Sequence, residues 1–175
     1  MKRRIFLGYG AGVLSLPHAE AGPNERPTLG AVGVGGKGWV DSLGASRHGE
    51  IAAFCDVDEL GKKRRGGFVE AAKKWPKAKR YTDWREMLEK EKLDGVTVST
   101  PDHMHAPVTM TALKLGISPY TQKPLTRTVH EARAITLAAR EEKVATQMGN
   151  QNHSGVNYKG LVDMVRAGLL GKIER

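Results

Sequence analysis

Short apolar runs alternate with longer amphipathic stretches along most of this chain. Apolar and β-branched runs predict strands over residues 29–34, 50–56, 95–99, 119–122 and 144–148. Apolar side chains at helical spacing predict helices over residues 38–46, 58–75, 83–88, 108–116, 129–139 and 158–167. Strands and helices that alternate with short connections predict an α/β fold, a doubly wound parallel sheet of the Rossmann type in three αβα layers.

The first predicted strand runs directly into a glycine-rich turn, Gly33-Val34-Gly35-Gly36-Lys37-Gly38. This turn fits the G-x-G-x-x-G fingerprint of dinucleotide binding, in which a strand feeds a tight turn and then a helix. Gly33 would allow the turn, Gly35 the approach of a pyrophosphate, and Gly38 close packing of helix on strand. Gly36 and Lys37 would start the helix, whose free N–H groups and positive dipole end favour phosphates.

The second predicted strand ends on a carboxylate, Asp56, followed by Val57. Asp56 follows the fingerprint glycines by 18 to 23 residues, the separation at which an acidic residue binds the hydroxyls of the adenosine ribose. A carboxylate there favours NAD over NADP, because it repels a 2′-phosphate. An ordinary turn residue is the alternative interpretation of Asp56.

Two further loops would meet the glycine turn at the carboxyl ends of the strands, where open parallel sheets bind ligands. The first loop carries Thr100, Pro101, Asp102, His103 and His105, and the second carries Gln122, Lys123 and Pro124. Lys123 is the candidate for chemistry, since an ammonium beside a dry pocket can polarise a hydroxyl and exchange its proton. A surface lysine is the alternative.

The spacing of His103 and His105 favours a cofactor or substrate contact at His105 over a metal pair. Two histidines at i, i+2 share one side only in an extended strand, and no further ligand set accompanies them. The sequence therefore predicts no metal site.

Composition narrows the remaining possibilities. The chain has 175 residues, a net charge of +9 and a single cysteine, Cys55, so neither an intramolecular disulfide nor a cysteine-based metal site can form. The basic residues cluster with few aromatic side chains among them, which favours solvated helix faces over a nucleic-acid surface. No apolar stretch reaches the ~20 residues of a membrane-spanning helix.

The N-terminus has the order of an export signal. Lys2-Arg3-Arg4 precedes a modestly apolar stretch, and Ala19-Glu20-Ala21 forms a small-x-small cleavage site. The Arg3-Arg4 pair before Ile5-Phe6-Leu7 resembles a twin-arginine signal. We therefore expect a signal peptide over residues 1–21, a linker over 22–27 and a periplasmic or exported protein. A basic tail on a cytoplasmic protein is the alternative.

The ordered motifs together resemble the N-terminal part of the glucose–fructose oxidoreductase and inositol dehydrogenase family (Gfo/Idh/MocA). The resemblance runs from about Thr28 onward and rests on the glycine turn and on five further segments: Cys55–Asp58, Tyr81–Leu88, Ser99–His105, Gln122–Leu125 and Gln147–Gln151. It implies an oxidoreductase that transfers hydride between NAD and a sugar, polyol or related carbohydrate. The alternatives are a relative that retains NAD and cleaves glycosidic bonds, and a non-catalytic nucleotide-binding module.

The resemblance also assigns roles to individual residues. The family's Glu-Lys-Pro motif matches Gln122-Lys123-Pro124, so Lys123 would contact the nicotinamide and the reacting hydroxyl, with Gln122 in place of the usual glutamate. Its Thr-Pro-x-x-x-His pattern matches Thr100, Pro101 and His105, beside the cofactor. Residues 28–150 would form the NAD(P)-binding domain, and residues 151–175 would begin the connection to a C-terminal substrate domain. The resemblance leaves open whether the full-length protein forms a homo-oligomer.

Overall fold

The computed structural model describes residues 26–60 and 65–172, so the predicted signal peptide lies outside the described residues. Six strands form one parallel sheet in the order β3-β2-β1-β4-β5-β6. The strands are β1 (Thr28–Val32), β2 (Glu50–Cys55), β3 (Lys79–Tyr81), β4 (Gly95–Val98), β5 (Ser118–Gln122) and β6 (Gln147–Gly149). The helices are α1 (Lys37–Ala45), α2 (Phe68–Lys74), α3 (Trp84–Lys90), α4 (His105–Lys114), α5 (Val129–Glu142) and α6 (Val156–Arg166), with short 3₁₀ turns η1 (Asp102–Met104) and η2 (Gln151–Ser154). The predicted α/β fold is confirmed.

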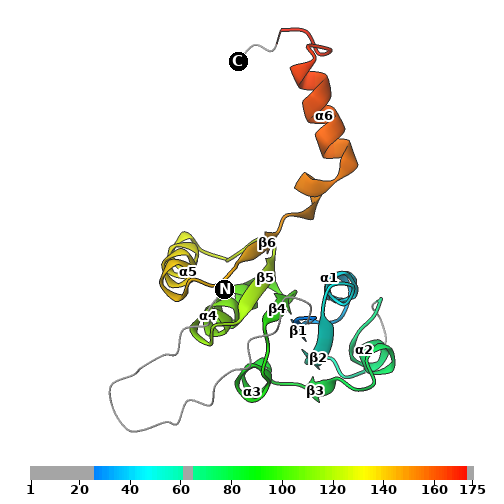
Figure 1. Cartoon of the computed structure of the whole chain (residues 1–175), viewed down its shortest axis with the longest axis vertical. Coiled ribbons are helices and arrows are strands. Elements are labelled where there is room, and N and C mark those ends of the chain that lie inside the picture. The colour runs from blue at the N-terminus through cyan, green and yellow to red at the C-terminus, as the bar shows by residue number, and fades with distance from the viewer. Residues whose placement is uncertain (1–25, 61–64, 173–175) are drawn as a thin grey trace.

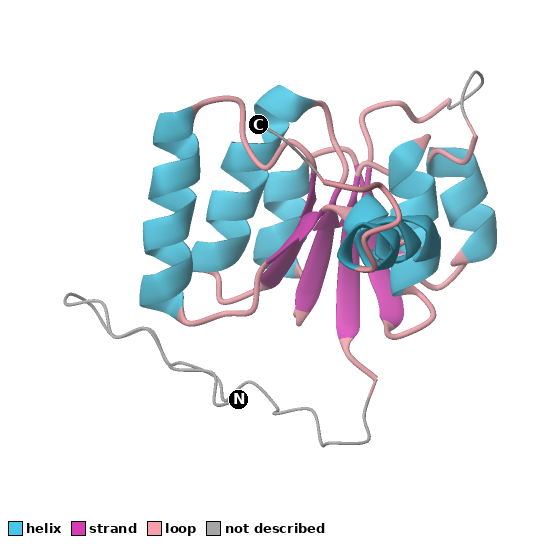
Figure 2. Cartoon of the chain, turned by 90° about the horizontal axis from the view of Figure 1, so that it is seen from above, coloured by secondary structure: helices cyan, strands magenta, loops and turns pink. Residues whose placement is uncertain are grey.

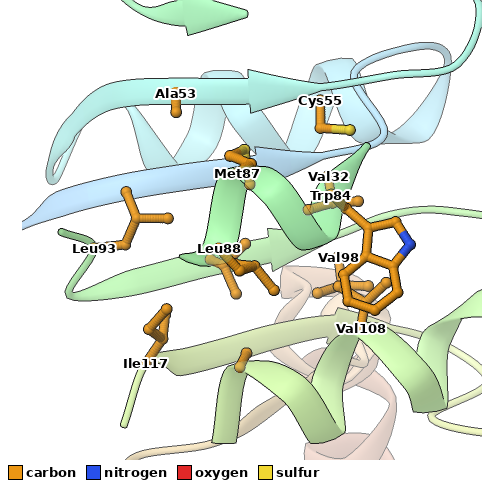
Figure 3. Packing of buried hydrophobic residues seen from close by; sticks show 12 residues of the cluster. Val32, Ala53, Cys55, Trp84, Met87, Leu88, Leu93, Val98, Val108 and Ile117 are labelled. Atoms are coloured by element: carbon orange, nitrogen blue, oxygen red, sulfur yellow. The ribbon is translucent and has the colours of Figure 1, made fainter. Parts of the chain in front are cut away.

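Helices lie on both sides of the sheet (Figure 2). On one side α3 and α4 pack on the strands through a buried cluster that includes Trp84, Met87 and Val108 (Figure 3). On the other side Trp39 of α1 and Ala71 of α2 pack on Phe54. Cys55 is a core residue of the first cluster, and its burial raises the pKa of the thiol to about 12.

Strand order reverses between β1 and β4 (Figure 1). The chain winds outward from β1 to β2 and β3, then crosses back and winds the other way through β4, β5 and β6. The helices that follow β1 and β4, α1 and α4, therefore lie on opposite sides of the sheet. This reversal is the place where open α/β sheets bind ligands.

Two predicted elements are wrong in extent. Among the described residues, the helix expected over residues 58–75 covers only Phe68–Lys74, and residues 58–60 are not helical. Gly66 and Gly67 have φ values of +76° and +109°, which do not occur in a right-handed helix. Gly66 instead forms an isolated antiparallel bridge with Gly35. The last strand covers Gln147–Gly149 instead of residues 144–148.

Two local features were also missed in the sequence. Lys79–Tyr81 forms the edge strand β3, whose charged residues carry no apolar pattern. The Asp83 side chain caps α3, and Glu86 on that helix pairs with Lys90. A reciprocal capping box lies at Thr128 and Glu131, at the start of α5.

The helix α6 stands away from the sheet and packs against η2 (Figure 1). None of its residues is buried, and its apolar side chains Leu161 and Met164 are 53% and 52% exposed. The core therefore lies within the sheet and the helices α1 to α5.

We predict that Met87→Ala destabilises the fold by about 2–5 kcal/mol, the usual cost of truncating a fully buried side chain to alanine. Met87, on α3, is 0% exposed and belongs to the cluster between this helix and the sheet. Urea unfolding measures the change. Leu137→Ala, at a residue 65% exposed on α5, is the matched control and should change stability by no more than about 0.5 kcal/mol. Equal effects of the two substitutions would contradict the described core.

Candidate functional site

The glycine turn after β1 packs directly against the end of β4. Gly33 has a φ of +81°, and a Cβ on it would lie 2.6 Å from the backbone oxygen of Ser99. A Cβ on Gly38 would lie 2.0 Å from the Gly33 oxygen and 3.1 Å from the Ser99 Cβ. Only glycine fits these two positions, because a methyl group would push apart the turn, the helix α1 and the β4 end.

Most backbone N–H groups of this turn have acceptors within the fold. Gly33 donates to the Cys55 oxygen, Gly36 to the Arg65 oxygen at 2.7 Å and Gly38 to the Gly35 oxygen at 3.0 Å. Within the described residues, the N–H groups of Gly35 and Lys37 have no backbone acceptor. Two amides at the positive end of α1 are thus available to an anion, as a dinucleotide pyrophosphate requires.

Asp56 supports the glycine turn from the neighbouring strand. Its Oδ2 accepts from the Val34 N–H at 2.9 Å, and its Oδ1 accepts from the Asp58 N–H at 3.0 Å. A carboxylate has about four lone-pair sites, so acceptor capacity remains for ribose hydroxyls. Val57 is 87% exposed beside it. The turn role and the ribose role, which the sequence presented as alternatives, are compatible in this geometry.

His105 connects the two remaining loops from a buried position. Its side chain is 1% exposed, with Nδ1 2.6 Å from the Pro124 oxygen and Nε2 2.8 Å from the Thr100 oxygen. Both ring nitrogens lie at hydrogen-bond distance from carbonyl oxygens, which accept from whichever ring nitrogen carries a proton, so the ring lies between the loops after β4 and β5. This geometry supports a positioning role for His105, and the contact with cofactor or substrate stays a prediction. Pro101 and Asp102, on the same loop, are exposed.

The loop after β5 combines a buried amide with an exposed ammonium. The buried Oγ1 of Thr100, on the loop after β4, has no hydrogen-bond partner among the described residues, and Gln122, which carries the buried amide, is 5% exposed. Gly149 of β6 lies against this amide, since a Cβ there would sit 2.4 Å from Gln122 Nε2. Lys123 is exposed in this chain, so the dry surroundings expected for it are not formed by the described residues.

A polar cluster beside the glycine turn escaped the sequence analysis. Lys37 Nζ lies 2.5 Å from Asp41 Oδ1, and the Ser99 hydroxyl donates to Asp41 Oδ2 at 2.8 Å. Burial, with a smaller contribution from the Asp41 charge, raises the pKa of nearby Tyr120. The i, i+4 spacing of Lys37 and Asp41 was the available signal, but such pairs are common on exposed helix faces.

Other kinds of site find little support in the described ranges. Across residues 26–60 and 65–172, no group of three or more His, Cys, Asp or Glu side chains could hold a metal ion. His103 is exposed, while His105 is used within the fold. No helix in the described part of the chain is long and apolar enough to cross a membrane.

Known proteins resemble this chain in sequence and in fold. A family model described as "Oxidoreductase family, NAD-binding Rossmann fold" (Gfo/Idh/MocA) matches residues 9–150. An alpha-N-acetylgalactosaminidase of Shewanella oneidensis is 31% identical over 156 residues, covering 85% of this chain and 34% of that protein. The chain thus spans about a third of the length of this curated relative.

Two solved structures share the fold at low identity. Myo-inositol 2-dehydrogenase of Lactobacillus plantarum superimposes with a TM-score of 0.75 at 19% identity, covering 85% of this chain and 43% of that one. Scyllo-inositol dehydrogenase of Lactobacillus casei, solved with bound NAD(H) and scyllo-inositol, superimposes with a TM-score of 0.72 at 19% identity and the same coverage. The fold, the glycine turn and the family match agree: the chain belongs to the Gfo/Idh/MocA oxidoreductase family and carries its NAD-binding Rossmann domain.

Proposed function

We propose that the chain binds NAD across the carboxyl ends of β1 and β4, and that the whole protein uses it to transfer a hydride to or from a carbohydrate. One observation carries the proposal. The glycine turn leaves the N–H groups of Gly35 and Lys37 without backbone acceptors at the reversal of strand order. A dinucleotide pyrophosphate supplies the anion that this end of a helix attracts.

The residues around the turn would each contact a different part of the cofactor. Gly35, Gly36 and the Lys37 amide would hold the pyrophosphate, and Asp56, with Val57 beside it, the adenosine ribose. Thr100 buries a hydroxyl oxygen that has no partner among the described residues, which a ligand at this end of the sheet can satisfy. His105 would keep the loops that carry Thr100 and Pro124 at a fixed separation.

Lys123 would serve the reacting end of the site. NAD supplies the acceptor for a hydride, and the substrate hydroxyl must lose a proton in the same reaction. The neutral Lys123 amine would accept the proton of that hydroxyl, and the ammonium formed would stay hydrogen-bonded to the substrate oxygen. The substrate class follows from the resemblance and from the two inositol dehydrogenases that share the fold. A cyclic polyol or a sugar is therefore the proposed substrate.

We predict that this chain binds NADH, and binds NADPH at least about tenfold more weakly. The Asp56 carboxylate would accept from the ribose hydroxyls of NADH and repel the 2′-phosphate of NADPH. Isothermal titration calorimetry of the folded chain with each dinucleotide measures the two affinities. Folded protein that binds neither would overturn the proposed function, and equal affinities would overturn the role of Asp56.

Two glycine variants test the location in the same titration. Gly36 lies in the chain between the two available amides and has a φ of +58°, so Gly36→Ala adds a methyl group and backbone strain at the turn and should weaken NADH binding. Gly116→Ala adds a methyl group in equally open space at a φ of +71°, after α4, and should leave the affinity unchanged. Equal affinities of the two variants would place the cofactor elsewhere.

A glycosidase is the second candidate, favoured by the 31% identity to an alpha-N-acetylgalactosaminidase. Such an enzyme would oxidise the sugar, cleave the glycosidic bond and reduce the product again, with no net change in NAD. We predict for a dehydrogenase one NADH formed per polyol or sugar oxidised by the full-length protein. Release of the aglycone from an N-acetylgalactosaminide without net NADH would select the glycosidase instead.

We further propose that the protein is exported through the twin-arginine route. The support is the Arg3-Arg4 pair, the apolar stretch after it and the Ala19-Glu20-Ala21 cleavage site. Cell fractionation should find mature protein that begins at Gly22 outside the cytoplasm. Arg3→Lys with Arg4→Lys should retain the precursor inside, while Lys2→Gln should not. Equal export of all three forms would contradict this route.

A further inference from the structure

We propose that Asp41 is a positioning residue that holds the Lys37 ammonium at the phosphate end of the dinucleotide site. This inference rests on the proposed function, because the phosphate end is defined by NAD binding. Lys37 is the first residue of α1, and Asp41 follows one helical turn later. Their side chains meet at 2.5 Å between Nζ and Oδ1.

The burial of Asp41 distinguishes this pair from an ordinary surface pair. Only 6% of the Asp41 side chain is exposed, against 43% for Lys37. The pair Lys90–Glu86 on α3 has the same sequence spacing and the same 2.5 Å separation, but both of its side chains are about half exposed or more, at 61% and 49%. Exposed pairs of this kind contribute little because the side chains stay mobile in water. A buried carboxylate leaves its partner fewer positions.

Asp41 is itself fixed from the opposite side. The Ser99 hydroxyl donates to Asp41 Oδ2 at 2.8 Å. Ser99 follows β4, and its backbone oxygen is the atom that a Cβ on Gly33 would strike. Asp41 therefore connects Lys37 to the point where the glycine turn meets the end of β4. The orientation of the ammonium is set by the same backbone contact that sets the turn.

Lys37 keeps donor capacity for a ligand in this arrangement. An ammonium group has three N–H donors. Asp41 accepts one, and the Gln151 side-chain oxygen lies 3.0 Å from Lys37 Nζ in the amide orientation that also lets Gln151 donate to the Gly149 oxygen at 2.6 Å. One N–H of the Lys37 ammonium therefore remains for a phosphate oxygen, and the backbone N–H of Lys37 is also available.

Two electrostatic effects of Asp41 on a bound pyrophosphate have opposite signs. Its negative charge alone repels the phosphates, so removing that charge would tighten binding. Its hold on Lys37 favours binding, so removing that hold would release a flexible side chain and weaken binding. The sign of the change in affinity therefore separates a positioning residue from a merely neighbouring charge.

The experiment is a double-mutant cycle measured by calorimetric titration with NADH and with ADP-ribose. We expect Asp41→Asn to raise the Kd for both ligands by about three- to tenfold, the effect of freeing one long side chain. Lys37→Met should also weaken binding, and adding Asp41→Asn to it should then cause no further loss. Glu86→Gln, which breaks the matched pair on α3, should change neither affinity.

Each other result has a defined meaning. Unchanged or tighter binding by Asp41→Asn would overturn the inference and leave the proposed function standing. An equal loss in the presence and absence of Lys37 would show that Asp41 acts through the fold, which also overturns the inference. Wild-type protein that is folded but binds neither ligand would overturn both the inference and the proposed function.

Discussion

The close approach of two backbone segments at the reversal of strand order is the contact on which the site depends. The turn after β1 and the first residues after β4 meet at Gly33 and Ser99, and α1 closes on them at Gly38. No side chain larger than hydrogen fits at either glycine. This contact fixes where α1 begins, and so fixes the direction of its first N–H groups. It also places Ser99 where its hydroxyl reaches Asp41.

The rest of the turn is held by the β2 side of the molecule. Asp56 accepts from Val34, the Arg65 oxygen accepts from Gly36, and Gly67 donates to the Val34 oxygen. A loop whose amides already have acceptors loses little further freedom when a ligand arrives, which is the physical advantage of a preorganised site. The two amides left over are therefore presented by a rigid frame.

The loops after β4 and β5 show a different balance. The ring nitrogens of His105 lie at hydrogen-bond distance from carbonyl oxygens of both loops, while the buried Oγ1 of Thr100 has no partner in the described part of the chain. Buried polar atoms without partners are uncommon, because each loses its hydrogen bonds to water. A bound ligand would supply the partner that this atom lacks.

Periodicity along the sequence determined the layered α/β fold and the position of the glycine turn, because each depends on neighbouring residues. It also predicted that Asp56 and the loops that carry Thr100 and Gln122 lie at one edge of the sheet, since parallel strands bring their carboxyl ends together there. The charged edge strand Lys79–Tyr81 and the short α2 could not be read in this way. The first lacks an apolar face, and Gly66 takes its conformation from a bridge to a distant glycine. Only the tertiary structure decided that His105 faces two carbonyl groups and that Asp41 is buried against Ser99, because both depend on residues brought together from separate strands.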